Sequence, residues 1–537
     1  MLNKGGAGMA ETMLMISLII VLCVVLSKVS SRMGVPVLLF FIILGMVFGS
    51  DGIIKIPFDN YALAENISTI AMVLIMFYGG FGTKWSAAKP VAVKALLLSS
   101  LGTVLTAGLT GIFCHFVLKI AILESFLIGA VISSTDAASV FSILRSKKLN
   151  LRENTASLLE VESGSNDPFA YMLTAVVLGI MNGSASGPKI AYMLFAQVAY
   201  GAVAGVVVAL LALLFLKHVK DNTGNISAIF ILAAALVAYA APTVLGGNGY
   251  LSAYITGIIL GNRRIPNKSV LVSFFDSTTG LMQMLLFFML GLLAFPSQLP
   301  NVALVGLLIA LFLTFVARPV AVFAILTPLR ASVRQSLIVS WSGMRGAASI
   351  VFAILAVIDP AVIDNDIFHI VFFIVLFSIL VQGTLLPAVS RKLKMIDEEA
   401  DVMKTFNDYA EEVPVQFMKF TLPEGHPWVG QAVSDIVVPP DSIFVLLMRK
   451  GERIVPDGST VLTVGDTLVL SGKTADGVGS ASLYERRIND SDEWNGKPLF
   501  DITADLLIIM IKRKEEVVIP KGDTVIKSGD ILVMTDK

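Results

Sequence analysis

Leu158-Leu-Glu-Val-Glu-Ser-Gly-Ser-Asn-Asp-Pro168 places three acids and an amide inside a long apolar stretch of the sequence. A charged side chain near the centre of a bilayer costs roughly 2.5 to 3.5 kcal/mol on insertion scales, so acids in such a stretch indicate a functional site with a partner. Two other segments offer partners: Ser133-Ser-Thr-Asp136 lies one apolar segment upstream, and Arg318 lies within an apolar run far downstream. Together, these segments predict a polar site inside a membrane.

The composition is that of an integral membrane protein. Of 537 residues, 55% are hydrophobic and only 15% are charged, and the mean hydropathy is +0.82. The formal net charge is zero, so we expect no nucleic-acid polymer as a partner. The two cysteines, Cys23 and Cys114, both lie in apolar runs and are too few for a disulfide framework or a metal site.

About thirteen runs are long and apolar enough to be membrane spans of about 20 residues. They lie near residues 12–27, 34–49, 61–81, 90–118, 122–145, 156–181, 189–217, 226–242, 247–262, 270–295, 301–327, 333–357 and 366–390. The sequence therefore predicts an all-α, polytopic membrane domain over residues 1–395. We expect its first apolar run to be a retained span rather than a removed signal peptide.

Basic residues are concentrated in alternate connectors between these runs, for example at Lys84 and Lys89 and at Arg330 and Arg334. The intervening connectors carry acids or small polar residues, such as Asp359. By the positive-inside rule the basic connectors are cytoplasmic, which predicts an N-terminus outside and a C-terminus inside the cell. An odd number of spans agrees with this topology. The expected location is the inner (plasma) membrane.

The sequence changes character after Arg391, where a polar linker at 396–412 leads into a cytoplasmic tail of α+β composition. The tail contains an internal repeat, because residues 444–470 and 508–534 carry Pro, Gly, Thr and Gly-Asp at the same offsets. Short β-branched runs separated by turn residues predict strands, so each copy is expected to be a small strand-rich module. We place the two modules at 413–475 and 476–537.

The polar residues of the central stretch divide between two faces of a helix. At 100° per residue, Ser163 and Asp167 share one face, and Glu162 and Asn166 share another. Glu162 and Asp167 are about 140° apart, so they do not serve one ligand. We predict that Asp167 with Ser163 binds a cation, and that Glu162 is a structural counter-charge for Arg318.

Three acids of the membrane part have alternative interpretations. Asp167 precedes Pro168, so it could instead cap a helix end, although the three consecutive polar residues that end at Asp167 exceed what a cap requires. Glu160 lies within about 20° of Asp167 on the cytoplasmic side and is predicted to draw cations inward. Asp276 either lines a cytoplasmic entry vestibule or marks the membrane interface.

Two spans are interrupted by polar or small residues, at Ser133–Asp136 and at Gly343–Ala347, where Arg345 is expected near the cytoplasmic end. Interrupted spans free backbone groups to coordinate ions in mid-membrane. The hydroxyl, carbonyl and carboxylate oxygens of these motifs suit alkali cations, whereas a transition metal would call for His or Cys. The four histidines lie at loop or span edges, and we expect them to be solvated: His115, His218, His369 and His426.

These motifs carry a family resemblance. Thr135-Asp136, Glu162-Ser-Gly-Ser-Asn-Asp167, the Arg318 span and Gly343-Met-Arg-Gly-Ala347 resemble, in order and spacing, the monovalent cation:proton antiporters of the NhaP type, which are relatives of the sodium/proton exchangers. The resemblance covers the whole membrane part. The duplicated tail resembles two TrkA-C modules, the C-terminal ligand-sensing units of potassium-conductance regulators.

The resemblance implies a homodimer in the bilayer, inverted repeats, and broken spans that cross near the ion site. It assigns the roles residue by residue: Asp167 is the carboxylate shared by cation and proton, Asp136, Ser163 and the Thr135 carbonyl are further ligands, Asn166 orients the site, and Glu162 pairs with Arg318. Some sodium-transporting relatives have an acid after the Phe of the third span. This chain has Phe77-Tyr78 instead, which puts sodium preference in doubt.

The predicted function is a transporter and not an enzyme, and no cofactor is expected. Burial disfavours a bare carboxylate, so a proton and K⁺ or Na⁺ compete for Asp167. A single acid beside Asn166 fits a one-for-one, electroneutral exchange of cytoplasmic K⁺, and possibly Na⁺, for external protons. Potassium is favoured because TrkA-C modules usually accompany potassium systems. The tail is expected to bind a small regulatory ligand, for which a cyclic dinucleotide is one candidate.

The alternatives are a Na⁺/H⁺ antiporter, a ligand-gated cation channel and a proton-coupled symporter of organic solutes. The channel is disfavoured because the sequence has no Thr-Val-Gly-Tyr-Gly filter. The symporter is disfavoured because the motifs offer small oxygen donors and no aromatic cradle.

Overall fold

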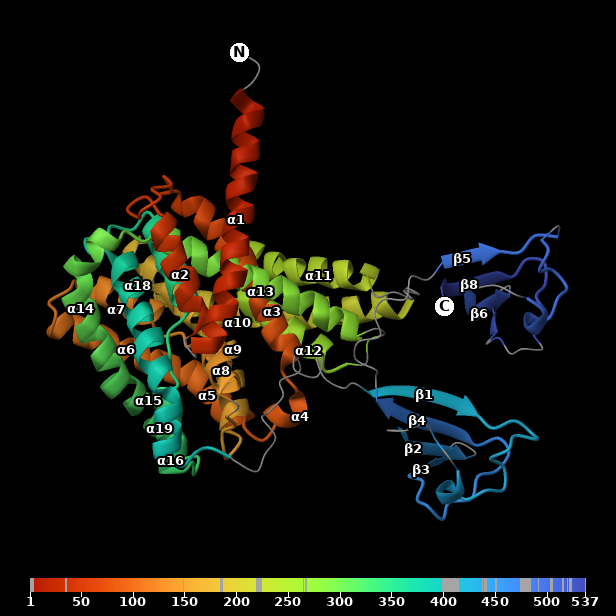
Figure 1. Cartoon of the computed structure of the whole chain (residues 1–537). Helices are drawn as coiled ribbons and strands as arrows, with labels where there is room; N and C mark the ends of the chain where they lie inside the picture. The colour runs from red at the N-terminus through yellow and green to blue at the C-terminus, as the bar shows by residue number, and fades with distance from the viewer. Residues whose placement is uncertain are drawn as a thin grey trace. The chain divides into compact units, whose positions relative to one another are not determined.

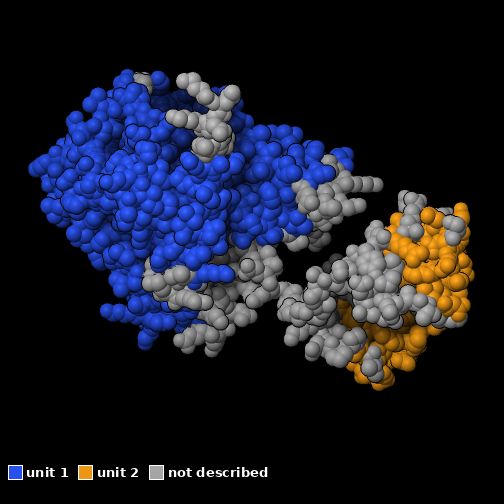
Figure 2. Space-filling model, turned by 45° about the horizontal axis from the view of Figure 1, so that its top comes forward, with its two compact units in different colours: residues 1–411 blue, residues 412–537 orange. Residues whose placement is uncertain are grey.

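The chain folds into two compact units, Met1–Glu411 and Glu412–Lys537 (Figure 2). The computed structural model describes residues 4–33, 36–147, 149–183, 187–218, 225–263, 265, 268–397, 415–436, 438, 442–449, 452–473, 484–490, 492–502, 506–513, 516–518, 520 and 524–536. Apart from its first two residues, the predicted linker 396–412 lies outside the described residues.

The first unit is helical (Figure 1). Its helices are α1 (Lys4–Met33), α2 (Val37–Phe48), α3 (Tyr61–Gly82), α4 (Trp85–Ala88), α5 (Ala92–Leu97), α6 (Thr103–Phe116), α7 (Ile122–Val131), α8 (Ala137–Ser146), α9 (Thr155–Met181), α10 (Gly187–His218), α11 (Asn225–Val244), α12 (Gly249–Gly261), α13 (Lys268–Leu293), α14 (Leu299–Phe312), α15 (Arg318–Leu326), α16 (Val333–Trp341), α17 (Ala347–Ile358), α18 (Ile367–Phe377) and α19 (Thr384–Lys392).

Polar side chains fix where several apolar helices begin. Asn60, Asn248, Ser332 and Asp366 each accept a hydrogen bond from the backbone N–H three residues later, at 2.9 to 3.1 Å. Among the described residues, seven helical segments are long and apolar enough to cross a membrane. The expected all-α membrane part is confirmed, whereas the total of thirteen spans stays a prediction.

The helices of the first unit pack in two groups. The scaffold group comprises α1–α3 and α10–α13, and the core group comprises α5–α9 and α14–α19. Within the scaffold group, Gly257 and Gly261 of α12 lie directly against the backbone of Phe77 and Phe81 in α3, where an added Cβ would overlap it. Such close approach of small residues is a common way for membrane helices to associate.

The core group contains the same series of elements twice. A helix with a π-helical turn comes first, then a helix broken by five residues, then a long helix. The π-helical turn of the first series is η1 (Leu98–Gly102), between α5 and α6, and that of the second is η3 (Leu313–Ala317), between α14 and α15. A third turn, η4 (Ser378–Gly383), lies between α18 and α19, in the long helix that ends the second series. The broken helices are α7/α8, interrupted at 132–136, and α16/α17, interrupted at 342–346. A basic connector precedes the first series and none precedes the second, as inverted repeats require.

The second unit holds two sheets of the same design, as the repeat predicts. The strands are β1 (Val415–Thr421), β2 (Ser442–Arg449), β3 (Glu452–Ile454), β4 (Thr467–Lys473), β5 (Tyr484–Arg487), β6 (Leu506–Arg513), β7 (Glu516–Val518) and β8 (Ile531–Asp536). Their orders, β1-β4-β2-β3 and β5-β8-β6-β7, correspond strand by strand, and all pairs are antiparallel.

Each sheet carries the same ion pair, in which the aspartate is buried and the arginine is partly exposed. Arg449 binds Asp466, and Arg513 binds Asp530, each with a shortest distance of 2.7 Å. The turn before each aspartate contains a glycine at positive φ, Gly465 in the first module and Gly529 in the second, which is the conformation that glycine adopts most readily. The duplication in the sequence therefore extends to side-chain contacts.

Candidate ion-binding site

The two broken helices meet at their interruptions. The backbone N–H of Asp136, at the end of the first break, donates a 2.8 Å hydrogen bond to the carbonyl of Met344 in the second. Gly346 lies so close to the Asp136 side chain that an added Cβ would overlap it. The breaks therefore cross in direct contact, which leaves helix ends and backbone carbonyls near one point.

Arg345 ties the crossing together. Its side chain is 1% exposed, and its Nη1 donates to the carbonyls of Ser133 and Ser134 at 2.7 and 2.8 Å. These carbonyls lie in the break after α7, where no helical N–H pairs with them. The expectation that Arg345 lies near the cytoplasmic end is wrong, because α16 ends after nine residues and the extended break carries Arg345 into the protein interior.

Helix α9 presents its polar residues to the first break. Asp167 is buried and accepts a hydrogen bond from the hydroxyl of Ser134. Ser163 donates to the Thr135 carbonyl at 2.8 Å, and Asn166 donates through Nδ2 to the Thr135 hydroxyl at 2.5 Å. The structure thus brings Asp167, Ser163, Asn166 and Thr135 together.

Asp136 lies at the N-terminus of α8. Its carboxylate accepts from the Ser139 backbone N–H at 3.2 Å and from the Ser139 hydroxyl at 2.5 Å, which is the geometry of a helix cap. The same residue lines the cavity that contains Asp167. It is therefore in place both to cap α8 and to face an ion.

Glu162 points away from Asp167, towards α15. Its carboxylate is 2.6 Å from Nη2 of Arg318, and both side chains are almost fully buried. This is the pairing that the resemblance implies. The helical face that holds this ion pair is thereby separated from the face that carries Asp167.

A cavity of about 540 Å³ leads to Asp167 between the core and scaffold groups. Glu160 and Asp276 both line it, as do Asp136 and Ser163. Tyr78, which follows Phe77 in α3, donates a 3.4 Å hydrogen bond to Asp276. The cavity wall therefore carries oxygen atoms from both helix groups.

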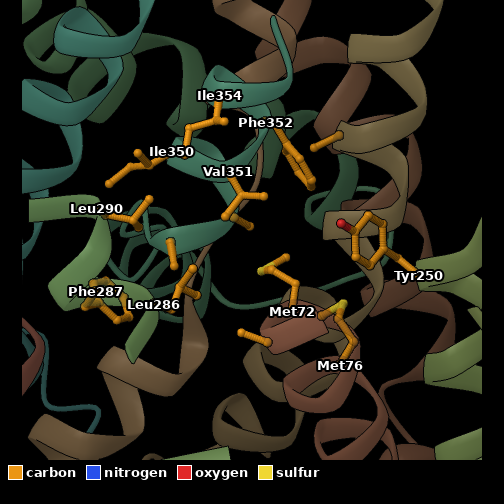
Figure 3. Packing of buried hydrophobic residues seen from close by; sticks show 14 of the residues in the cluster. Met72, Met76, Tyr250, Leu286, Phe287, Leu290, Ile350, Val351, Phe352 and Ile354 are labelled. Atoms are coloured by element: carbon orange, nitrogen blue, oxygen red, sulfur yellow. The ribbon is translucent and has the colours of Figure 1, made fainter. Parts of the chain in front are cut away.

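An apolar cluster lies between the scaffold and core groups (Figure 3). Its residues come from α3, α12 and α13 of the scaffold group and from α17 of the core group: Met72, Met76, Tyr250, Leu286, Phe287, Leu290, Ile350, Val351, Phe352 and Ile354. The rings of Tyr250 and Phe352 meet across the boundary between the groups, with centroids 6.2 Å apart. Four members of the cluster, Met72, Met76, Leu286 and Phe287, also line the cavity, so the cluster forms part of its apolar wall.

Sequence reasoning missed two partners and misjudged one histidine. No role was predicted for Ser134, although it lies in the Ser133–Asp136 break, next to the predicted ligand Thr135. Glu124, buried in α7, accepts hydrogen bonds from the Asp364 backbone and the Asn365 side chain. His369 is 4% exposed and not solvated, because it bridges Asp366 and the backbone N–H of Phe295.

The polar groups at the site are oxygen atoms and the amide of Asn166. Within the part of the chain that the structure describes, no group of three or more His, Cys, Asp or Glu side chains is arranged to hold a metal ion. Hydroxyls, a carbonyl and a carboxylate suit an alkali cation or a proton. A buried carboxylate that lines a cavity can therefore exchange one of these for the other.

Comparison with known proteins agrees with this geometry. Residues 17–392 match the family described as sodium/hydrogen exchanger, transmembrane, and residues 417–477 and 483–535 each match the TrkA-C domain. The K⁺/H⁺ antiporter NhaP of Alkalimonas amylolytica is 33% identical over 469 residues, which is 87% of this chain and 82% of that protein. The K⁺/H⁺ antiporter NhaP2 of Shewanella sp. strain ANA-3 is 32% identical over 463 residues, covering 85% and 80%.

A solved structure has the same fold in the membrane part. The sodium proton antiporter MjNhaP1 from Methanocaldococcus jannaschii superposes with a TM-score of 0.62 at 24% identity. The match covers 70% of this chain and 99% of that one.

Proposed function

Because the chain belongs to the sodium/hydrogen exchanger family, we propose that it is a secondary antiporter that exchanges cytoplasmic K⁺ for external protons at Asp167. One observation carries the proposal: a buried carboxylate lies at the crossing of two broken helices and is reached through a cavity. Solvation loss makes the bare carboxylate costly, so the site binds either a proton or a cation.

The arrangement supports an exchange of one ion for one proton. Asp167 has an amide neighbour, Asn166, which adds no charge, and Glu162 is already neutralised by Arg318. Each loaded form then carries the same net charge through the membrane. Asp136, Ser163 and the Thr135 carbonyl are the proposed further ligands, and Glu160 and Asp276 are the proposed entry residues.

Potassium is the proposed cation, and sodium is the alternative. Curated relatives that cover most of the chain are named K⁺/H⁺ antiporters, and the chain carries two TrkA-C domains. Tyr78 instead of an acid leaves fewer charged oxygens in the cavity, which favours the less strongly hydrated ion. A channel is not favoured, because the chain belongs to the sodium/hydrogen exchanger family and curated relatives of it are named antiporters.

The cellular setting follows from charge and family. We infer an inner-membrane protein with the N-terminus outside and the tail in the cytoplasm, because the basic connectors then face inward. On this topology the cavity opens to the cytoplasm, since the α3 end that lines it is followed by Lys84. The tail would bind a small ligand, with a cyclic dinucleotide as candidate, and the chain would work as a homodimer.

The test is cation-driven dissipation of a pH gradient in proteoliposomes. Purified protein is compared in K⁺, Na⁺ and Li⁺, with the membrane potential clamped and unclamped. We expect a K⁺-dependent signal that does not change on clamping and that is lost in Asp167→Asn. The matched control is Asp59→Asn, which alters an exposed acid between α2 and α3 and should retain wild-type activity.

Two outcomes would contradict the proposal. Full activity of Asp167→Asn would remove the central carboxylate from the mechanism. Cation movement without counter-movement of protons would instead support the channel.

A further inference from the structure

Tyr254 is a scaffold residue that reaches the ion path. It lies on α12, is 3% exposed, and lines the cavity together with Glu160 and Asp167. Its ring packs on Gly164 of α9, so closely that a Cβ added at Gly164 would lie 2.7 Å from the tyrosine hydroxyl. The hydroxyl is thus held beside the α9 backbone, one turn before Asp167.

The hydroxyl of Tyr254 is buried and lacks a hydrogen bond. It lies near the hydroxyls of Thr83 and Ser165, but among the described residues none forms a hydrogen bond of acceptable geometry with it. Leaving a buried hydroxyl unpaired costs about 1 to 3 kcal/mol, and such groups usually have a partner. Because Tyr254 lines the cavity, a partner can approach its hydroxyl from there.

The surroundings of the hydroxyl indicate the charge of that partner. Two acids, Glu160 and Asp167, line the same cavity as Tyr254. A cation moving from one acid to the other would pass the phenol oxygen, which is a neutral and hard ligand. An anion would be repelled by both carboxylates.

We propose that the Tyr254 hydroxyl is a cation ligand on the cytoplasmic approach to Asp167, between Glu160 and Asp167. The inference deepens the proposed antiport and rests on it. Tyr254 belongs to the scaffold group, whereas both acids are on α9 of the core group. The oxygen is therefore available to the ion only while α9 lies against α12, with the cavity open on this side. It assists cytoplasmic loading and not release on the other side.

The test is Tyr254→Phe, which removes one oxygen atom and retains the ring against Gly164. We expect the KM for K⁺ offered on the cytoplasmic side to rise roughly three- to tenfold, the usual effect of losing one polar contact. The maximal rate and the KM for K⁺ on the opposite side should stay unchanged. In purified protein, the K⁺ concentration needed for half-maximal thermal stabilisation should rise by the same factor.

The matched control is Tyr250→Phe, four residues earlier on the same helix. Tyr250 is also buried, but its hydroxyl pairs with Thr69 at 3.5 Å and it does not line the cavity. It should retain the wild-type KM on both sides. An unchanged cytoplasmic KM in Tyr254→Phe, or equal changes on both sides, would overturn the inference.

Failure of the antiport proposal would be recognised separately. If wild-type protein shows no K⁺-dependent proton movement, or if Asp167→Asn keeps it, the proposed function is wrong. If both behave as expected and only Tyr254→Phe matches the wild type, the antiport stands and Tyr254 is not a ligand.

Discussion

Arg318 and Glu162 form an ion pair of 2.6 Å, and both side chains are almost completely buried. A buried pair is not a reliable source of stability, but removal of one partner leaves a charge without compensation, at a cost of about 3 to 5 kcal/mol. The pair therefore makes the contact between α9 and α15 depend on both residues.

Glu162→Gln should lower the apparent Tm of the purified protein by at least about 5 °C, because Arg318 is left charged and buried. The double variant Glu162→Leu/Arg318→Met removes both charges and should recover most of this loss. Thermal unfolding in one detergent measures all three proteins. If the double variant were as unstable as the single one, the uncompensated charge would not be the cause.

Ser134→Ala should weaken K⁺ binding roughly three- to tenfold, because the hydroxyl donates to the ionised Asp167, the form that binds the cation. The KM for K⁺ in proteoliposomes measures the effect. Ser133→Ala is the control, since the Ser133 hydroxyl bonds to the Ala130 carbonyl at 2.6 Å and not to Asp167. Equal effects on the KM in both variants would indicate that any substitution in the break weakens K⁺ binding, and not specifically the loss of the Ser134 hydroxyl.

Arg345→Met should reduce both stability and transport, because the carbonyls of Ser133 and Ser134 lose their donor, at about 1 to 3 kcal/mol for each buried group. Arg345→Lys keeps the charge and should be intermediate. Arg334→Met changes an exposed arginine on α16 and should match the wild type. Tm and transport rate are the measurements, and an undamaged Arg345→Met would show that the crossing does not need its guanidinium.

The tail modules should lose stability in acid. The Arg449 hydrogen bond lowers the pKa of Asp466; burial raises the pKa of Asp530, but the hydrogen bonds from Arg513 and Lys527 and the charges of both residues together outweigh it, so the pKa is again lowered. The ionised forms therefore stabilise the fold fully above the unfolded-state pKa of about 3.9, and this contribution disappears as pH falls through the lower folded-state pKa.

Hydrogen exchange of β4 and β8 in the full chain, corrected for intrinsic rates, measures this loss. Asp466→Asn should expose β4 to exchange already at neutral pH and leave β8 at its wild-type rate, so the second module serves as an internal control. Equal protection of β4 in wild type and variant would contradict the assigned role of the ion pair.

The sequence predicted the architecture well, because apolar length and turn composition depend on local residues. It identified the break at Ser133–Asp136 and the repeat in the tail. The helical period also separated Glu162 from Asp167 correctly, as their contacts with Arg318 and Ser134 show. These features need only the geometry of one element.

Contacts between distant segments were harder to predict. The position of Arg345 was predicted wrongly because an extended break has no helical period. The depth of its side chain in the protein therefore cannot be derived from its position in the sequence. His369 looked like an edge residue because its partner Phe295 lies 74 positions away. Tyr254 gave no signal, since one aromatic residue in an apolar run is ordinary until Gly164 is seen against it.

The apolar cluster between the two helix groups has a consequence for the temperature dependence of transport. If the core group moves so that Asp167 faces the other side, water must reach side chains such as Val351 and Phe352 that are now packed together. Wetting apolar surface carries a positive heat-capacity change, so the enthalpy of that step varies with temperature. An Arrhenius plot of the turnover rate should therefore curve, even while the protein remains fully folded.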